Sequence, residues 1–204
     1  MYADEVGGEG PHRWVLMCLV ALQDRGLALY PTHRLVRGVD PEGLADAIRR
    51  DFDIEEIGRD ALVPRAAGAD GRIVMGYMDS HFKRAFRLTL KDAAIADRAL
   101  EGKPEPYRRL DTAVLEALLL KGALGLSEDD ISHLHGLDYA RDEAQAREKV
   151  DSGEADAAFL MTGTPVDRVR DVAAAGENMP PKSTYFFPKV LTGMIFNPLE
   201  DQWP

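Results

Sequence analysis

The chain has 204 residues, of which 45% are hydrophobic, and 35 acidic against 25 basic residues give it a formal net charge of −10. This size and composition are typical of a globular protein with a hydrophobic core. The acidic balance disfavours nucleic acid and anionic membrane surfaces as partners, because both attract proteins through basic side chains.

The N-terminus MYADEVGGEG is acidic and Gly-rich, which predicts a flexible segment over residues 1–13 followed by a single domain over residues 14–204. It lacks the pattern of a signal peptide, and no apolar run approaches the roughly 20 residues that span a membrane. We therefore expect a cytoplasmic protein. One cysteine and five histidines without ligand spacing predict no metal site.

The first part of the chain predicts strands followed by a helix. The run WVLMCLVAL (14–22) is unbroken and apolar, which predicts a strand buried on both faces with Cys18 as a small hydrophobic residue. A polar turn separates it from GLALY (26–30), so we expect these two strands to form a hairpin. A helix should then run to about residue 52, with Asp40 as its cap and Pro41 in its first position.

The middle of the chain predicts a short strand in DIEEIG and then a β-hairpin. RIVMGYM (72–78) and FKRAFRLTL (82–90) flank Asp79-Ser80-His81, and the second run alternates apolar and charged residues. The segment KDAAIADRALEG should be a helix that ends at Gly102.

The last part of the chain mixes helices and strands. We expect a helix over 110–125 with Asp111 as its cap, a connection with a short strand near 137–139, and a helix capped by Asp142. A strand over 155–161 should precede a helix over 164–176 with Thr164 as its cap. One or two strands interrupted by Pro188 should follow. Because helices and strands do not alternate strictly, the pattern favours an α+β fold with a mixed, largely antiparallel sheet and flanking helices over an α/β fold.

The segment GENMPPKS resembles a phosphate-binding loop of the G-x-x-x-x-G-K-[ST] type, since Gly176, Lys182 and Ser183 occupy three of its four fixed positions. The fourth position holds Pro181. Such a loop binds phosphate through successive backbone N–H groups, and proline has none. A helix also precedes the glycine where a strand is required. We conclude that this is not a loop of that type.

A rigid Pro-Pro corner nevertheless brings cationic and hydroxyl side chains together: Lys182, Ser183, Thr184 and Lys189. Two cations and two hydroxyls can bind a phosphate or carboxylate through side chains alone. The competing interpretation, which is somewhat favoured, is that the prolines stiffen the entry into a strand, the aromatic residues pack in the core and the lysines are solvated.

A second candidate is the loop YPTHRLVRGV, in which Arg34 could recognise an anion and His33 could act as an acid or base. A plain charged turn is again the simpler interpretation. The pair His133 and His135 lacks a third metal ligand. Asp79-Ser80-His81 has the composition of a catalytic triad, but neighbours in a tight turn point apart.

Two stretches, LYPTHRLVRG and the segment from DEAQAREKVDSG through GENMPPKSTYFFPKVLTGMIF, resemble the domain of unknown function 1015 family. The resemblance covers nearly all of the chain from about Trp14 onward, and Ala155 to Phe196 holds its most specific part. It implies that the KST corner and the THR loop are positions characteristic of that family.

Members of that family carry an upstream half with an Asp-Gly-His-His-Arg motif, similar to the nucleotide-binding motif of ParB-like and free-serine-kinase proteins. This chain lacks the motif, so the resemblance predicts that it corresponds to the later portion of the family architecture. The family has no settled function, and a nucleotide-dependent, kinase-like role is what the upstream motif implies.

Two functional hypotheses follow. In the first, the chain handles phosphate or a nucleotide with Mg²⁺: Arg34, Lys182 and Lys189 hold an anionic or phosphorylated ligand, Ser183 and Thr184 donate hydrogen bonds, and His33 serves as acid or base. It requires PTHR and PPKST to lie side by side. In the second, the chain is a non-catalytic interaction or scaffold domain, compatible with a homo-oligomer, and exposed Tyr185, Phe186 or Phe187 would favour it.

Overall fold

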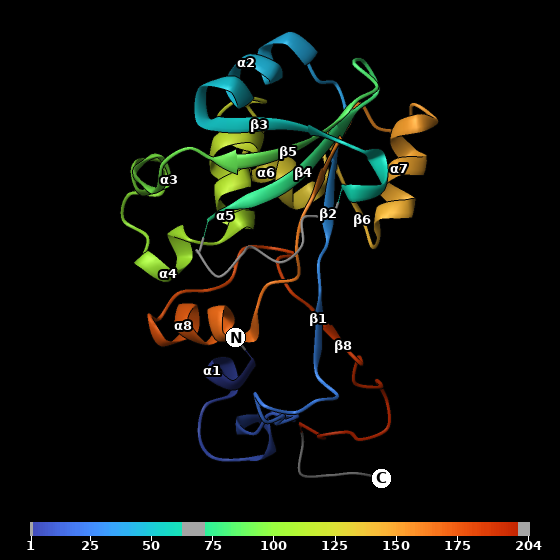
Figure 1. Ribbon diagram of the computed structural model, residues 1–204. Helices are drawn as coiled ribbons and strands as arrows, with labels where there is room; N and C mark the ends of the chain where they lie inside the picture. The colour runs from blue at the N-terminus through green and yellow to red at the C-terminus, as the bar shows by residue number, and fades with distance from the viewer. Residues whose placement is uncertain (1, 63–71, 200–204) are drawn as a thin grey trace. The chain divides into compact units, whose positions relative to one another are not determined.

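Two units make up the chain in the computed structural model, which describes residues 2–62 and 72–199. Unit 1 combines the two ends of the chain, Met1–Ala28 and Phe186–Pro204, and unit 2 is Leu29–Tyr185. Nearly all of the regular structure belongs to unit 2 (Figure 1). The predicted boundary at residue 13 stays a prediction.

A six-stranded sheet forms the centre of unit 2, with the strand order β3-β5-β4-β7-β2-β6, and every neighbouring pair is antiparallel. The strands of the described chain are β1 (Ala28–Tyr30), β2 (His33–Val36), β3 (Phe52–Ile57), β4 (Val74–Asp79), β5 (Ala85–Leu90), β6 (Leu137–Ala140), β7 (Ala157–Leu160) and β8 (Tyr185–Phe187). The remaining two strands, β1 and β8, pair in a separate small sheet.

Helices cover both faces of the larger sheet. The α-helices of the described chain are α1 (Tyr2–Val6), α2 (Pro41–Asp51), α3 (Ala93–Ala99), α4 (Glu105–Arg108), α5 (Asp111–Leu115), α6 (Glu128–His133), α7 (Glu143–Asp151) and α8 (Val166–Ala174). Two short 3₁₀ turns are η1 (Pro11–Arg13) and η2 (Arg59–Ala61), and α5 continues into a π-helical segment, η3 (Glu116–Lys121). The fold is therefore α+β, as the sequence predicted.

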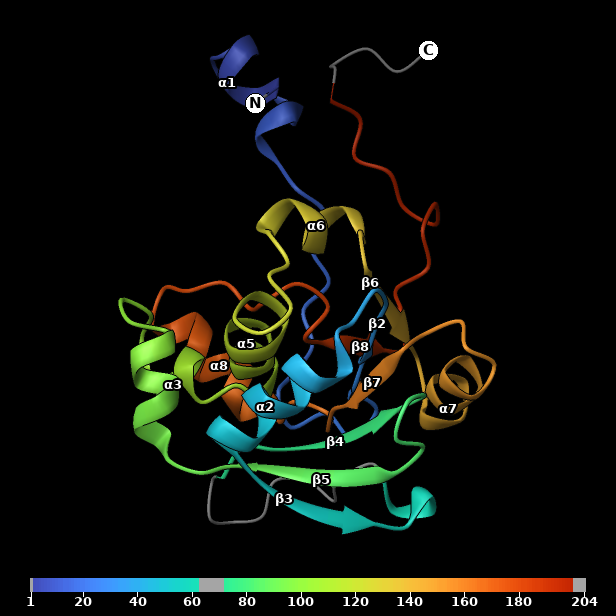
Figure 2. The same cartoon turned by 90° about the horizontal axis from the view of Figure 1, so that it is seen from above.

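The period-two alternation of side chains along the strands divides the core into two layers. Val36, Tyr77 and Phe159 belong to the layer that α2, α5 and η3 cover, whereas Leu35 and Ala158 belong to the layer under α7. Figure 2 shows α2 and α5 together over the sheet and α7 apart from them. Each fully buried Leu or Phe side chain contributes roughly 1.5–3 kcal/mol by leaving water.

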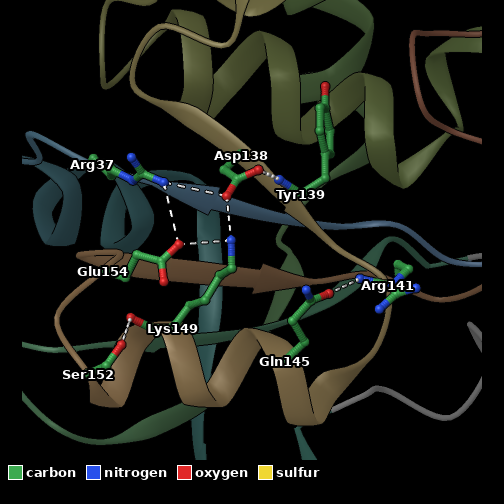
Figure 3. Close-up of polar contacts among 8 residues, drawn as sticks. All are labelled: Arg37, Asp138, Tyr139, Arg141, Gln145, Lys149, Ser152 and Glu154. Atoms are coloured by element: carbon green, nitrogen blue, oxygen red, sulfur yellow. Dashed lines mark hydrogen bonds and ion pairs between the residues drawn. The ribbon is translucent and has the colours of Figure 1, made fainter.

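A network of ion pairs joins α7 to the edge of the sheet (Figure 3). Lys149 Nζ lies 2.6 Å from Asp138 Oδ2 and 3.0 Å from Glu154 Oε1. Arg37 Nη2 closes the network at 3.4 Å and 3.8 Å from the same two carboxylates. Single exposed pairs contribute little to stability, so this network chiefly orients α7 against β2 and β6.

Several sequence predictions are confirmed. Asp40 caps α2 by accepting a hydrogen bond from Glu42 N, and Asp142 caps α7 by accepting one from Gln145 N. The strands β4 and β5 form the expected antiparallel hairpin. Gly176, with φ +73°, ends α8 as predicted.

The predicted buried strand over residues 14–22 is wrong. These residues form no strand in the structure, and Trp14, Val15 and Leu19 are 74%, 78% and 84% exposed. Cys18 is exposed rather than buried. None of the described residues of unit 1 is buried, so the apolar run has no layer against which to pack. The expected hairpin with 26–30 is wrong for the same reason, since β1 pairs with β8 instead.

Other predictions concerned the ends of elements. Leu110 and Pro165, not Asp111 and Thr164, occupy the capping positions of α5 and α8. The expected C-terminal strands reduce to the three residues of β8, which stops before Pro188 because proline cannot donate to a ladder. Three short helices, α1, α4 and α6, were not predicted, although a capping box of Ser127 and Asp130 begins α6. The expected loop at residues 33–36 is wrong, because these residues form the buried strand β2.

Candidate functional site

The first strand of the candidate site, β2, begins beside the end of β7 because the two strands run antiparallel, with Arg34 opposite Phe159. The loop before β2 and the loop Thr162-Gly163-Thr164 therefore lie at the same end of these two strands. A side chain at Gly163 would place its Cβ 2.5 Å from the Leu29 carbonyl oxygen, so only glycine allows this approach. Figure 1 shows the segment between α8 and β8 passing the same end of β2.

Arg34 joins these segments. Its side chain is only 4% exposed. Nη1 donates to the Thr32 carbonyl at 2.5 Å, and Nη2 lies 3.3 Å from the carbonyl oxygens of both Pro181 and Lys182. The guanidinium carbon also lies 5.6 Å from the centre of the Tyr139 ring, a cation–π contact. The PTHR and PPKST segments are thus side by side, as the first hypothesis required.

The PPKST segment is a tight turn whose backbone is held from within. Ser183 N donates to the Pro180 carbonyl at 3.2 Å, and Ser183 Oγ donates to the same oxygen at 2.7 Å. Thr164 Oγ1 donates to the Ser183 carbonyl at 3.2 Å. Ser183 is buried, so its hydroxyl is committed to the turn.

Lys182 occupies the third position of this turn with φ +55°, in the left-handed region. That region costs a residue with a side chain about 1–2 kcal/mol, and glycine avoids the cost. The Lys182 side chain is exposed. Because a trans peptide is planar, the Lys182 N–H points away from the Pro181 carbonyl and from Arg34. It donates to no acceptor among the residues that the structure describes.

An acidic group, Asp111, balances the buried arginine. Its Oδ1 accepts from Thr112 N at 2.7 Å and its Oδ2 accepts from Thr162 Oγ1 at 3.3 Å. Burial raises the pKa of Asp111, and the charge of Arg34 opposes that rise. Burial likewise lowers the pKa of Arg34, and electrostatic interactions with Tyr139 and Asp111 oppose that decrease. Each charge therefore reduces the cost of burying the other.

The side chain of His33 points into the other layer of the core. Neighbouring residues of a strand point to opposite faces, so His33 and Arg34 diverge. His33 is 1% exposed, and its Nδ1 accepts a hydrogen bond from Met161 N at 3.1 Å. Burial, together with the charge of Arg34, lowers the pKa of His33 to about 4. It is consequently neutral at pH 7, and its predicted role as acid or base finds no support in this geometry.

Of the predicted site residues, the structure brings Arg34, Lys182, Ser183 and Thr184 together. Thr184 is half-buried. Lys189 is exposed and belongs to unit 1, so its part in an anion site stays a prediction.

Four further residues belong to the site and were not predicted as its members from the sequence: Asp111, Tyr139, Thr162 and Thr164. Two hydroxyl residues directly after a strand, in the stretch TGTP, were the available signal for Thr162 and Thr164.

The paired histidines lie elsewhere. The rings of His133 and His135 are 5.9 Å apart, and their partners are Asp129 and Asp130. Over residues 2–62 and 72–199, no group of three or more His, Cys, Asp or Glu side chains could hold a metal ion. Over the same residues, every helix is too short or too polar to cross a membrane.

Comparison with known proteins identifies the family. No curated protein matches the chain. Among solved structures, it is similar to a conserved hypothetical protein from Pyrococcus furiosus, with a TM-score of 0.46 and 14% identity over 82% of this chain and 59% of that one. A free serine kinase in complex with AMP gives the same TM-score and identity over 82% of this chain and 56% of that one. The chain thus spans less than three fifths of the length of these structures.

A family model, described as a protein of unknown function (DUF1015), matches residues 2–113. The match includes the LYPTHRLVRG stretch and leaves out the C-terminal stretch from Ala155 to Phe196, on which the resemblance chiefly rested. Because it spans more than half of the 204 residues, the chain belongs to the DUF1015 family.

Proposed function

We propose that this chain is a phosphate- or nucleotide-handling domain that contacts its anionic ligand through the turn from Pro180 to Thr184. The observation that carries the proposal is the clamp of Arg34 on the carbonyl oxygens of Pro181 and Lys182. The buried Arg34 side chain fixes the turn by binding these two carbonyl groups. The side of the turn that faces away from Arg34 is then left for a ligand.

The proposal assigns three donors to the ligand: the Lys182 backbone N–H, the Lys182 ammonium group and the Thr184 hydroxyl. Charge-assisted hydrogen bonds of this kind are the strong contacts of phosphate sites. The left-handed backbone at Lys182 supports the proposal, because strain retained in a turn where glycine would fit is typical of functional positions.

The residues therefore have two kinds of role. Lys182 and Thr184 would contact the ligand, whereas Arg34 and Ser183 position the turn and Asp111 holds Arg34 by its charge. Lys189 remains a predicted further contact. Phosphoryl transfer, which the family resemblance implied, stays a prediction, as does a requirement for Mg²⁺.

The experiment is a thermal-stability assay with ATP, ADP, inorganic phosphate and phosphoserine, each with and without Mg²⁺. At ten times its Kd a ligand stabilises the native state by about 1.4 kcal/mol, which raises the Tm by roughly 3–6 °C for a chain of this size. We expect such a rise for at least one anion, its loss in Lys182→Ala, and its retention in Lys83→Ala.

Lys83 is a matched control, because it is also an exposed lysine with a positive φ, +57°, in the connection between β4 and β5. A second variant, Lys182→Gly, separates binding from folding: relief of backbone strain should raise the Tm of the free protein while the anion response is lost. The proposal fails if no anion raises the Tm, or if Lys182→Ala and Lys182→Gly respond like the unchanged chain.

A second candidate function, protein–protein association, rests on exposed apolar side chains. Tyr185 is 38% exposed and Phe187 is 47% exposed, and in unit 1 the run 14–20 and the residues Val190, Leu191 and Met194 to Phe196 are also exposed. Exposed apolar surface of this extent is typical of contact sites. Association of copies would give a mass above 22.5 kDa by light scattering, and Leu19→Asp should restore the monomer. A monomeric mass at high protein concentration would remove this candidate.

A further inference from the structure

An apolar cavity of about 260 Å³ lies between α2 and one face of the larger sheet. Its lining includes Ala45, Ile48, Ile54, Tyr77, Phe82 and Phe86. The register explains how three strands build its floor. Tyr77 of β4 lies opposite Phe86 of β5, and Ile54 of β3 lies opposite the next floor residue of β5, Leu88. Alternate residues of a strand share one face, so these side chains lie together.

The floor of this cavity is aromatic and is not fully covered by the protein. The rings of Tyr77 and Phe86 are stacked, with their centroids 6.3 Å apart. Phe82 and Phe86 are only half-buried, and Ile54 is 42% exposed. Apolar side chains that remain partly exposed in a hollow are stabilised when an apolar ligand covers them.

The polar side chains of the lining are hydrogen-bond donors. Among the described residues they are Arg49, Arg84 and Tyr77. Burial raises the pKa of Tyr77, and the charge of Asp79 and a hydrogen bond between the two side chains add to that rise. The Tyr77 hydroxyl is therefore neutral and already has a partner. Because a guanidinium group only donates, the two arginines favour a ligand with a negatively charged acceptor.

Carboxylate groups outside the lining hold both arginines at this cavity. Arg84 Nε donates to Glu56 Oε1 at 2.7 Å, and Arg84 Nη2 pairs with the same carboxylate. The Arg84 guanidinium carbon also lies 5.4 Å from the centre of the Phe86 ring, which places the charge beside the apolar floor. Arg49 Nη1 donates to Asp46 Oδ1 at 2.7 Å. Exposed pairs of this kind are weak, so a bound carboxylate can share or replace these partners.

We propose that this cavity binds a small carboxylate that carries an aromatic ring. The ring packs against Tyr77, Phe82 and Phe86, and the carboxylate accepts from Arg84 and Arg49. A cavity of about 150 Å³ can hold benzene, so the volume of about 260 Å³ leaves room for a ring with a short acid chain. The PPKST turn is not part of this site, and either proposal can be correct without the other.

The test is a titration of the chain, ¹³C-labelled at its isoleucine and leucine methyl groups, with sodium 3-phenylpropionate. A bound ring should shift the methyl resonances of Ile48, Ile54 and Leu88 in a saturable way, because ring currents act only at short range. The neutral analogue 3-phenylpropan-1-ol has the same ring and chain and measures the apolar contribution alone. We expect the alcohol to bind about tenfold more weakly than the acid.

Arg84→Gln separates recognition of the carboxylate from the apolar cavity. It should weaken binding of 3-phenylpropionate about tenfold and leave binding of the alcohol unchanged. Arg87→Gln is the matched control, because Arg87 also pairs with a glutamate of β3, Glu55, at 2.8 Å. As the neighbour of Phe86 in β5, Arg87 points to the other face of the sheet, so this variant should bind both compounds like the unchanged chain.

Both arginines are exposed, so both variants should fold, and an unchanged methyl spectrum without ligand checks this. Three results would each overturn the proposal. They are the absence of saturable shifts at the three methyl-bearing residues, equal affinities for the acid and the alcohol, and equal affinities of Arg84→Gln and Arg87→Gln for the acid.

Discussion

At the scale of single residues, the neighbours His33 and Arg34 in β2 point to opposite faces of the sheet and have different roles. Arg34 turns towards α5, where it holds the PPKST turn, and His33 turns to the other layer, where its Nδ1 accepts the Met161 N–H. The strand geometry alone separates them, because successive side chains alternate between faces. The pairing of His33 with an anion held by Arg34 is therefore not supported, although both lie in one short motif.

The buried histidine predicts a dependence of stability on pH. Its pKa is about 4 in the folded chain, against an ordinary value of 6.5. Because the folded pKa is lowered, the contribution is complete above pH 6.5 and is lost as the pH falls towards 4. Between pH 7 and pH 5 the free energy of unfolding should fall by roughly 2 kcal/mol on this account.

Urea denaturation at the two pH values measures this change. His33→Asn keeps an acceptor for the Met161 N–H but cannot titrate, so most of the decrease should disappear in that variant. An equal decrease in both proteins would show that other groups cause it.

At the scale of elements, aspartate residues at the start of a helix have two different roles: some cap the helix, and one takes part in the candidate site. Asp40 and Asp142 accept hydrogen bonds from the first turn of their own helices. Asp111 stands at the first position of α5, and its Oδ2 accepts from Thr162, whereas Thr164 turns away from α8 to donate to the Ser183 carbonyl. In both Asp111 and Thr164, a hydrogen bond to a residue distant in the sequence replaces the capping bond that the local sequence predicted.

The strand β4 makes a close backbone contact that predicts a large effect. A Cβ at Gly76 would lie 1.9 Å from the Leu62 carbonyl oxygen and 3.2 Å from Leu160 Cβ. Gly76→Ala must therefore displace backbone, and the free energy of unfolding should fall by about 3 kcal/mol or more in urea denaturation.

Gly102→Ala provides the comparison. Gly102 has φ +86° and open space around it, so the substitution should cost only about 1 kcal/mol of backbone strain. If the two variants were equally stable, the close approach of Leu62 to β4 would be refuted.

At the scale of the whole molecule, burial is distributed unequally between the two units. Every buried hydrophobic side chain of the described chain belongs to unit 2, and the described residues of unit 1 include none. Amide protection depends on buried, hydrogen-bonded structure.

Hydrogen–deuterium exchange should consequently distinguish the units. Peptides from residues 14–27 and 188–199 should exchange within the earliest time points, and peptides from β4, β5 and β7 should be protected for the longest times. Slow exchange over residues 14–22 would contradict the structure there. Slow exchange that appears only at high protein concentration would instead support the association candidate.

The sequence by itself determined what depends on near neighbours along the chain. The α+β class, the helices capped by Asp40 and Asp142, the β4–β5 hairpin and the family stretch around Arg34 could all be predicted from periodicity, capping and motif. The candidate residues of the PPKST turn were found in the same way. Pro181, which has no backbone N–H, was enough to exclude a phosphate-binding loop of the glycine-rich type.

Only the tertiary structure decided what depends on distant segments. The bonds from Arg34 to the PPKST turn join residues about 147 positions apart. They show that its guanidinium holds the turn, which no local pattern indicated. The apolar run 14–22 has the composition of a core strand but no layer to cover it. Burial is a property of the surroundings of a side chain, and those surroundings come from chain segments that local pattern does not specify.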